Sequence, residues 1–373
     1  GADVSADGIV AAHSKIHGGR STRVNSSSDG PTGAATSGAP HVPVEVLRAL
    51  TALRRPVIVA HVVPDADALG SMLGFARAWK TGDCVPKASL PAESLSTRLA
   101  FLLEWSQVPI ASLDDFRAAD GFVVFDTARK PRSNVGAELK ETDWATNRPV
   151  IVIDHHESST RFGTLNWIVA DASSTAELVY KVLVAAGRTI DRATASLLYA
   201  GLQTDTLGFS LPTTTASSLA VAAELVRCGA DVGELGERLC RSHRQSEFDL
   251  LRVIYANTKR VGEGVAYSSA SYEEIHEAGC TAADIDEQIN VPRSLDGVRL
   301  AMLFTEGRRG KTRINFRGSG NVTVVELAAE FGGGGHSQAA GAVLDCGLEE
   351  TIERVVPRTT EFVKRFPPNG ERK

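Results

Sequence analysis

One histidine and two aspartates follow an apolar run at residues 56–60. The segment HVVPDADALGS, residues 61–71, comes directly after PVIVA and contains His61, Asp65 and Asp67. Carboxylates this close repel each other, and one is pushed toward protonation unless a cation neutralises the pair. The alternative is a helix N-cap formed by Asp65 or Asp67, with His61 a hydrogen-bonded strand-end residue. This segment alone does not distinguish a metal site from a helix cap, and both interpretations stand on equal terms.

The same residue types follow further apolar runs. Asp126 comes after four apolar residues in FVVFDTA, and VIVIDHHES places Asp154, His155 and His156 in a row. Asp205 follows the apolar helix ASLLYAGLQ in the segment TDTLGF. The carboxyl ends of neighbouring parallel strands lie at one edge of a sheet, so the groups that follow strands can converge there. Imidazole and carboxylate together suit divalent Mn, Fe, Zn or Mg, and the combined pattern favours a metal site over unrelated caps.

Short strands alternating with helices must position these side chains. Strands are predicted over residues 57–61, 121–126 and 150–154, each almost continuously apolar, as is typical of parallel strands covered on both faces. Amphipathic or alanine-rich stretches lie between them. This rhythm predicts an α/β fold whose N-terminal sheet is mainly parallel, with helices on both faces.

Changes in composition along the chain predict four parts. Residues 1–42 are rich in Gly, Ser, Thr and Ala and are expected to form a disordered tail. Residues 43–232 form the first domain, and residues 233–260 read as a long charged helix that links it to the second. Residues 261–373 mix strands and helices and are expected to form a smaller α/β domain.

Composition limits the class of protein. The net charge of −5 argues against a protein that coats nucleic acid through its overall charge. The 5 cysteines form no CxxC pair, which favours free thiols in a reducing compartment. No apolar run approaches the roughly 18 residues that a membrane-spanning helix needs. A cytoplasmic protein without a membrane segment is therefore expected.

Taken together, these motifs resemble the DHH phosphoesterase family. The resemblance is carried by DHH at residues 154–156, by HxxxDxD upstream, by the strand-end Asp126 and by the aspartate of TDT. FGGGGHSQAAG, residues 331–341, resembles the glycine-rich motif of a C-terminal domain associated with one branch of that family. In layout the chain is most similar to the short-oligonucleotide phosphodiesterases. Those enzymes degrade nano-RNA and linear or cyclic dinucleotides, and many dephosphorylate 3'-phosphoadenosine 5'-phosphate.

The resemblance implies a catalytic site with two divalent metal ions, usually manganese, with magnesium or another divalent ion as an alternative. The implied ligands are His61 and Asp65 for one ion, Asp67, His155 and Asp205 for the other, and Asp126 as a bridge. His156 would face the substrate phosphate, and Asp154 would orient its neighbours. Such a site activates water for an in-line displacement at phosphorus. Asp126, His156 and Asp154 are accordingly the expected catalytic residues.

By the same resemblance, residues 261–373 are the associated domain that holds the substrate. Glycine lets the backbone approach a ligand and direct its N–H groups at it. The expected substrate-binding residues are Arg317, Gly332, Gly333, Gly334, Gly335 and His336. Expected partners are short single-stranded RNA or DNA oligonucleotides, linear or cyclic dinucleotides and a nucleoside bisphosphate. The resemblance also leaves room for a homodimer.

The chain departs from the family pattern in two places. Asn315 and Gly318 replace serines that flank the arginine, and TDTLGFS places Leu207 and Ser210 where the family pattern is TDTG-x-F-R. These departures leave the contacts to substrate and the preferred substrate length open. All of the implied metal ligands are present, which favours an active enzyme.

The function expected from the sequence is a phosphodiesterase that converts short oligonucleotides to mononucleotides, with 3'-phosphoadenosine 5'-phosphate phosphatase activity as an addition. One alternative is a catalytically silent sensor of cyclic dinucleotides. Another is an inorganic pyrophosphatase, which is disfavoured because that branch of the family lacks the GGGGH domain. A RecJ-type exonuclease for long strands is disfavoured because the chain has little room for additional strand-binding modules.

Overall fold

A computed structural model describes most of the chain beyond its first forty residues. The described residues are 41–91, 95–135, 147–242, 244–281, 285–335 and 337–367. The expected tail therefore lies almost wholly outside them, and so does His336 of the glycine-rich motif. No helix in these ranges is both long enough and apolar enough to cross a membrane.

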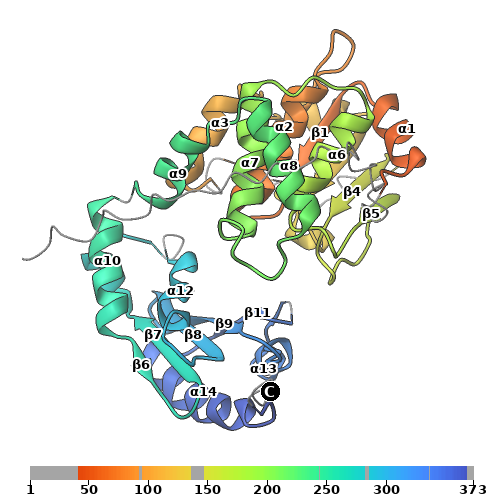
Figure 1. The fold of residues 1–373 in the computed structure, drawn as a ribbon. Helices are drawn as coiled ribbons and strands as arrows, with labels where there is room; N and C mark the ends of the chain where they lie inside the picture. The colour runs from red at the N-terminus through yellow and green to blue at the C-terminus, as the bar shows by residue number, and fades with distance from the viewer. Residues whose placement is uncertain are drawn as a thin grey trace, which may run out of the picture. The chain divides into compact units, whose positions relative to one another are not determined.

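The first domain is built on a parallel sheet, as predicted (Figure 1). Its strands run in the spatial order β2-β1-β3-β4-β5, and every neighbouring pair is parallel. The strands are β1 (Pro56–Val59), β2 (Lys87–Ala88), β3 (Gly121–Phe125), β4 (Val150–Asp154) and β5 (Leu165–Ile168). The three predicted strands are thus confirmed as β1, β3 and β4. The register aligns their carboxyl ends at one edge of the sheet.

Apolar side chains on both faces of the central strands explain their nearly continuous apolar sequence. Ile58, Val123 and Ile151 point to one face and join the core formed with α2, α6 and α7. Val57 and Phe122 point to the other face, which packs against α4. The helices of this domain are α1 (Val44–Ala52), α2 (Ala66–Trp79), η2 (Thr97–Leu99), α3 (Ala100–Ser106), α4 (Leu113–Ala118), η3 (Lys130–Arg132), α6 (Thr175–Ala185), α7 (Arg192–Asp205) and α8 (Ala216–Arg227).

Glycines allow α2 and α7 to pack closely. A Cβ atom added at Gly70 of α2 would lie 2.3 Å from the carbonyl oxygen of Leu197 in α7. A Cβ atom added at Gly201 of α7 would lie 2.6 Å from Oδ1 of Asp67 in α2. Because both helices carry aspartates of the expected metal site, this contact fixes how far apart those aspartates lie.

Asp191 joins the start of α7 to the end of α2. Its Oδ1 accepts a hydrogen bond from Thr194 N at 2.8 Å and so caps α7. Arg77 donates to the same carboxylate, with 2.6 Å between Nη2 and Oδ2. The Arg77 guanidinium holds the pKa of Asp191 well below its usual range. The ionised carboxylate is therefore the form that stabilises the fold.

Replacing Asp191 by asparagine keeps a capping side chain but removes the charge. The free energy of unfolding near neutral pH should fall by about 1 kcal/mol, because the pair is partly exposed and screened. A lowered folded pKa gives stability that is complete above the unfolded pKa of about 4 and is lost as the pH falls through the folded value. Urea unfolding should therefore show a smaller difference between wild type and variant at about pH 3 than near pH 7. A difference independent of pH would contradict this account.

The predicted linker, residues 233–260, is two helices and a strand rather than one long helix. α9 (Val232–Cys240) and α10 (Gln245–Ala256) are separate, and β6 (Lys259–Arg260) already belongs to the second sheet. The apolar residues of α9 join the core of the first domain, whereas Leu250 and Ile254 of α10 join a core of the second. The long-helix prediction was wrong because each half buries its apolar face against a different domain.

The second domain contains a mixed sheet, in the order β10-β11-β9-β8-β7-β6. Along β8, Leu300 and Met302 pack in one core with α13 and α14, while Ala301 and Leu303 pack in another with α10. The remaining strands are β7 (Val265–Ala270), β8 (Leu300–Arg308), β9 (Lys311–Gly318), β10 (Gly334–Gly335) and β11 (Ala339–Leu344). The remaining helices are α11 (Tyr272–Glu277), η5 (Asp286–Ile289), α12 (Asn290–Arg293), α13 (Val325–Glu330) and α14 (Leu348–Val363). The smaller α/β domain expected from the sequence is confirmed.

Candidate metal centre

The segment that follows β1 serves as both a helix cap and part of the acidic cluster. Asp65 is the N-cap of α2, and its Oδ1 accepts a hydrogen bond from Ala68 N at 3.0 Å. Its other oxygen, Oδ2, lies 3.8 Å from Nε2 of His61. The two interpretations that the sequence left open are therefore compatible, because capping uses only one oxygen of the carboxylate.

Asp126 lies directly after β3 at the centre of the cluster. Its Oδ2 is 3.4 Å from Nε2 of His61, and its Oδ1 is 3.6 Å from Nε2 of His155. Thr175 donates a hydrogen bond from Oγ1 to the same Oδ1 at 3.0 Å. The backbone of Asp126 has a φ of 51°, a left-handed conformation that aspartate tolerates better than most residues. The turn directs this buried carboxylate into the space between the two histidines.

The three residues of the DHH motif have different surroundings. Asp154 ends β4 and is fully buried, and its Oδ1 accepts hydrogen bonds from both N and Nδ1 of His156, at 3.2 Å and 2.6 Å. Nε2 of His155 lies 3.3 Å from Oδ2 of Asp205, at the end of α7. Asp154 thus orients the second histidine, and the first lies between two carboxylates.

Asp67 is held by the first turn of α6. Its two carboxylate oxygens accept backbone hydrogen bonds from Thr175 N at 2.7 Å and Ala176 N at 2.9 Å. These N–H groups are among those that a helix start leaves unpaired, and the helix dipole also favours an anion there. This contact joins the start of α6 to a carboxylate more than a hundred residues earlier in the chain, and no local sequence pattern indicates it. Thr175 is therefore a site residue that sequence reasoning missed.

Among the residues that the structure describes, three groups of side chains have donor atoms close enough together to hold a metal ion. Within each group the donor atoms lie within 4.8 Å of one another. The groups are His61, Asp65 and Asp126; Asp67, His155 and Asp205; and Asp126, His155 and His156. Asp126 and His155 each belong to two groups, which places the groups side by side. The structure thus brings together all of the expected metal ligands.

The charges in this cluster favour a bound cation. Burial and the nearby carboxylates of Asp126 and Asp205 raise the pKa of Asp67 well above its usual range, and burial together with Asp126 raises that of Asp205 in the same way. Burial also opposes ionisation of Asp126, but its contacts with the histidines outweigh this and lower its pKa. Carboxylates that repel each other become fully ionised only when a cation neutralises them.

The donor set and one buried oxygen fit divalent metal ions. All of the donors are carboxylate oxygens and imidazole nitrogens, which suit hard and borderline divalent cations. Oδ2 of Asp154 is buried and has no hydrogen bond within the described residues, so this carboxylate can still orient a further neighbour.

The turn after Asp205 has a backbone conformation that its sequence disfavours. Leu207 and Phe209 have φ values of 46° and 65°, and Gly208 between them has a φ of 64°. Left-handed conformations of residues other than glycine cost about 1–2 kcal/mol. The strain at Leu207 arises where the family pattern has glycine.

Replacing Leu207 by glycine should raise the free energy of unfolding by up to about 1 kcal/mol, because relief of the left-handed strain exceeds the entropic cost of glycine. Thermal unfolding checks this, with Leu207→Ala as the matched control. Alanine loses the same exposed side chain but keeps the strained Cβ, so it should not be stabilised. Equal stability of the two variants would show that the turn is not strained.

In the second domain, Arg317 and part of the glycine-rich segment share one face of the sheet. Arg317 pairs with Ala339, Asn315 pairs with Gly341, and Gly341 pairs in turn with Gly334. Directly paired residues project on the same side of an antiparallel pair. Arg317, Asn315 and Gly334 therefore project to one face of the sheet, where Asn315 is buried, Arg317 is half-buried and Gly334 is exposed.

Gly318 and Gly333 have structural reasons to be glycine. A Cβ atom at Gly318 would lie 2.1 Å from the carbonyl oxygen of Val322, and one at Gly333 would lie 2.1 Å from the carbonyl oxygen of Gly341. Gly318 also projects to the opposite face from Arg317, since side chains alternate along a strand. A serine at this position would therefore clash and would not reach the face of Arg317.

Comparisons with known proteins agree with these features. Residues 55–202 match the family model "DHH family, N-terminal domain", and residues 262–365 match "DHHA1 domain". The bifunctional oligoribonuclease and PAP phosphatase NrnA of Thermus thermophilus is 30% identical over 324 residues, which cover 86% of this chain and 94% of that protein. NrnA of Bacillus subtilis is 27% identical over 304 residues, covering 80% of this chain and 92% of the relative.

A solved structure supports the fold. The crystal structure of an exopolyphosphatase-related protein from Bacteroides fragilis has a TM-score of 0.77 to this chain at 24% identity, and the match covers 86% of this chain and 96% of that one. Both domain models, the Thermus thermophilus relative and the clustered aspartates and histidines lead to one conclusion. The chain belongs to the DHH phosphoesterase family.

Proposed function

We propose that the protein is a metal-dependent phosphodiesterase that hydrolyses short oligonucleotides and dinucleotides to mononucleotides and also dephosphorylates 3'-phosphoadenosine 5'-phosphate. The observation that carries this proposal is the pair of metal-binding groups at one edge of the sheet, with Asp126 in contact with both. The names of the relatives, oligoribonuclease and PAP phosphatase, support the substrate class.

The proposed ligands are divided between two metal ions, following the groups of neighbouring donor atoms. His61 and Asp65 would hold one ion, and Asp67, His155 and Asp205 would hold the other. Asp126 would bridge them. Manganese is the proposed metal, since mixed carboxylate and imidazole donors suit it. Bound divalent ions would lower the pKa of a water molecule and neutralise charge on the phosphoryl group.

Residues around the ligands have positioning roles in this proposal. The backbone N–H groups of Thr175 and Ala176 fix Asp67, and Oγ1 of Thr175 fixes Asp126. Asp154 accepts a hydrogen bond from Nδ1 of His156 and so sets the orientation of that ring toward the substrate. Burial lowers the pKa of His156, but Asp154 and Asp126 raise it to about 9. A protonated His156 can donate to a phosphate oxygen.

The division of labour between domains is part of the same proposal. The first domain would carry the chemistry, and the face of the second sheet with Arg317, Asn315 and Gly334 would hold the other end of the substrate. A guanidinium group recognises phosphate through paired hydrogen bonds, and the glycine backbone allows close approach. A two-ended grip of this kind favours very short substrates.

Hydrolysis of the linear dinucleotide pApA, followed by chromatography, tests the proposal. AMP should appear when Mn²⁺ is present and should not appear after EDTA treatment, and it should reappear when Mn²⁺ is restored. 3'-Phosphoadenosine 5'-phosphate should release phosphate with the same dependence on metal. Turnover that persists in EDTA would contradict the metal-dependent reaction. Binding of cyclic di-AMP without turnover of any of these substrates would instead support a silent sensor.

A further inference from the structure

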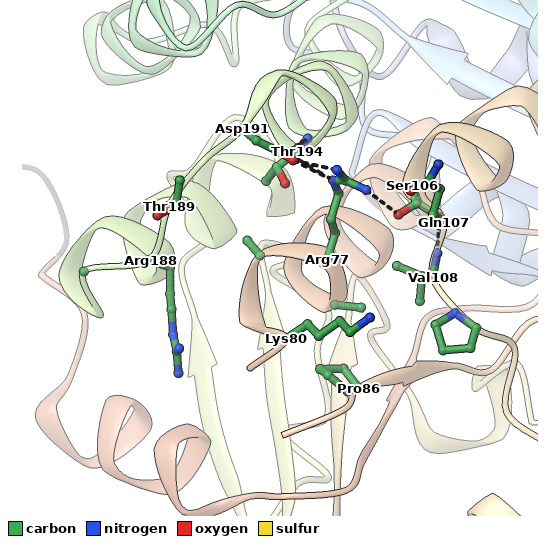
Figure 2. Close-up of a pocket in the computed structure, with 14 residues that line it drawn as sticks. Arg77, Lys80, Pro86, Ser106, Gln107, Val108, Arg188, Thr189, Asp191 and Thr194 are labelled. Carbon is green, nitrogen blue, oxygen red and sulfur yellow. Dashed lines mark hydrogen bonds and ion pairs between the residues drawn. The ribbon is translucent and has the colours of Figure 1, made fainter. Parts of the chain in front are cut away.

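We propose that the first domain has a second ligand site: a pocket for a small phosphorylated molecule of mononucleotide size, at the ends of α2 and α7 remote from the metal centre. The pocket has a volume of about 490 Å³ and is open to solvent. It is lined by the last residues of α2, the segments around Pro86 and Ser106, and the connection from α6 to α7 (Figure 2). None of its residues belongs to the metal-binding groups.

Positive charge dominates this pocket. Among the described residues, Arg77, Lys80 and Arg188 line it together with one carboxylate, that of Asp191. The Arg77 guanidinium already has hydrogen-bond partners within the protein. It donates to Asp191 and, from Nη1, to the carbonyl oxygen of Ser106 at 3.0 Å (Figure 2). The other two cations are therefore left to attract an anion.

Lys80 and Arg188 have no carboxylate partner within the part of the chain that the structure describes. The guanidinium carbon of Arg188 lies 4.3 Å from the centre of the Trp79 ring, which holds this side chain in place. A guanidinium held in place by stacking is suited to phosphate, because its Nη groups can donate charge-assisted hydrogen bonds.

Apolar residues make up another part of the lining. Ala76, Pro86, Val108 and Pro109 lie beside the charged residues. Small-molecule sites of about 300–1,000 Å³ commonly combine an apolar wall with a few polar groups that fix orientation. Cations for a phosphate and an apolar wall for a ring system together fit a nucleoside monophosphate.

The pocket is connected to the metal centre by two helices. α2 starts beside Asp65 and Asp67 and ends at the pocket, whereas α7 starts at the pocket and ends at Asp205. A helix of this length spans about 20 Å. An anion held by Lys80 and Arg188 lies in the same pocket as Asp191 and repels its carboxylate, which disturbs the Arg77–Asp191 pair that joins the two helix ends. We therefore expect occupancy of the pocket to change turnover at the metal centre.

Equilibrium dialysis of labelled AMP against the full chain with Mn²⁺ tests this site. The double variant Lys80→Ala/Arg188→Ala should bind one AMP fewer per chain than the wild type, or bind it with affinity about tenfold weaker or more. The matched control is Arg117→Ala/Lys364→Ala, which removes two exposed cations elsewhere and should bind as the wild type does. Equal binding by all three proteins would overturn the proposal.

Two further measurements distinguish this site from the catalytic site. In initial rates, before product AMP accumulates, the Lys80→Ala/Arg188→Ala variant should hydrolyse pApA with wild-type kcat and KM, because neither residue contacts the metal centre. Asp126→Asn, which alters only the metal centre, should retain the AMP molecule that depends on Lys80 and Arg188. Loss of that molecule in Asp126→Asn would place it at the metal centre and overturn the proposal. Inorganic phosphate as competitor shows whether the phosphate group alone is recognised.

Discussion

Replacing Asp126 by asparagine should abolish hydrolysis of pApA, lowering kcat/KM by about 10³-fold or more, the effect of losing roughly 4 kcal/mol of transition-state stabilisation. Asp126 contacts His61 and His155 through different oxygens, so it touches one histidine from the ligand set proposed for each ion. Asparagine has the same shape and tolerates the left-handed backbone at this position. The loss should therefore come from the missing charge and not from misfolding. Initial rates of AMP release with Mn²⁺ measure it.

Two controls make this result decisive. Circular dichroism and thermal unfolding should show that Asp126→Asn folds as the wild type does. Titration with Mn²⁺ should show weaker metal binding in the variant. A folded Asp126→Asn enzyme that keeps more than about a tenth of wild-type kcat/KM would rule out Asp126 as the bridge between two ions.

Replacing Gly201 by alanine should disrupt the metal centre without changing any ligand. The added Cβ would lie 2.6 Å from Oδ1 of Asp67 and 2.9 Å from Cβ of Ala176, the residue whose N–H holds that carboxylate. Asp67 must move, and a displacement of about 1 Å at a catalytic site can cost about 10²-fold in rate. Overpacking of the interface between α2 and α7 should also lower the free energy of unfolding by about 1–3 kcal/mol. Rates with pApA and urea unfolding measure the two effects.

Gly236→Ala is the matched control for this substitution. Gly236 also lies in a helix, α9, but a Cβ added there would have no atom within 4 Å. Alanine should therefore leave activity unchanged and stabilise the helix by about 0.5–1 kcal/mol. Wild-type activity in Gly201→Ala would mean that Asp67 does not need its present position and would remove it from the proposed ligand set.

The sequence by itself determined the parallel sheet and the side chains that gather at its edge. Unbroken apolar runs such as residues 150–153 are typical of strands covered on both faces, as in parallel sheets with helices on each side. A parallel sheet aligns its carboxyl ends, so residues that follow those strands must lie at one edge. Asp126 and His155 could for this reason be placed together from local pattern alone.

The resemblance to a family added what local pattern could not supply. Asp205 ends a helix, and no periodicity in the sequence indicates that this helix end lies beside His155. For the glycine-rich segment, the resemblance in turn left out a role that the structure shows. Sequence suggested that all of its glycines approach a ligand, whereas Gly333 is also required for packing against Gly341.

Only the tertiary structure decided how the side chains of the metal centre are held and where the pocket at the ends of α2 and α7 lies. The bonds from the start of α6 to Asp67, the space that Gly201 leaves for that carboxylate, and the pairing of Arg77 with Asp191 all join segments distant in the chain. The same packing divided the expected linker into two helices. Backbone preference and apolar period act over a few neighbouring residues and can be read locally. Distances between remote side chains depend on how whole helices pack, and packing is settled only when the complete core forms.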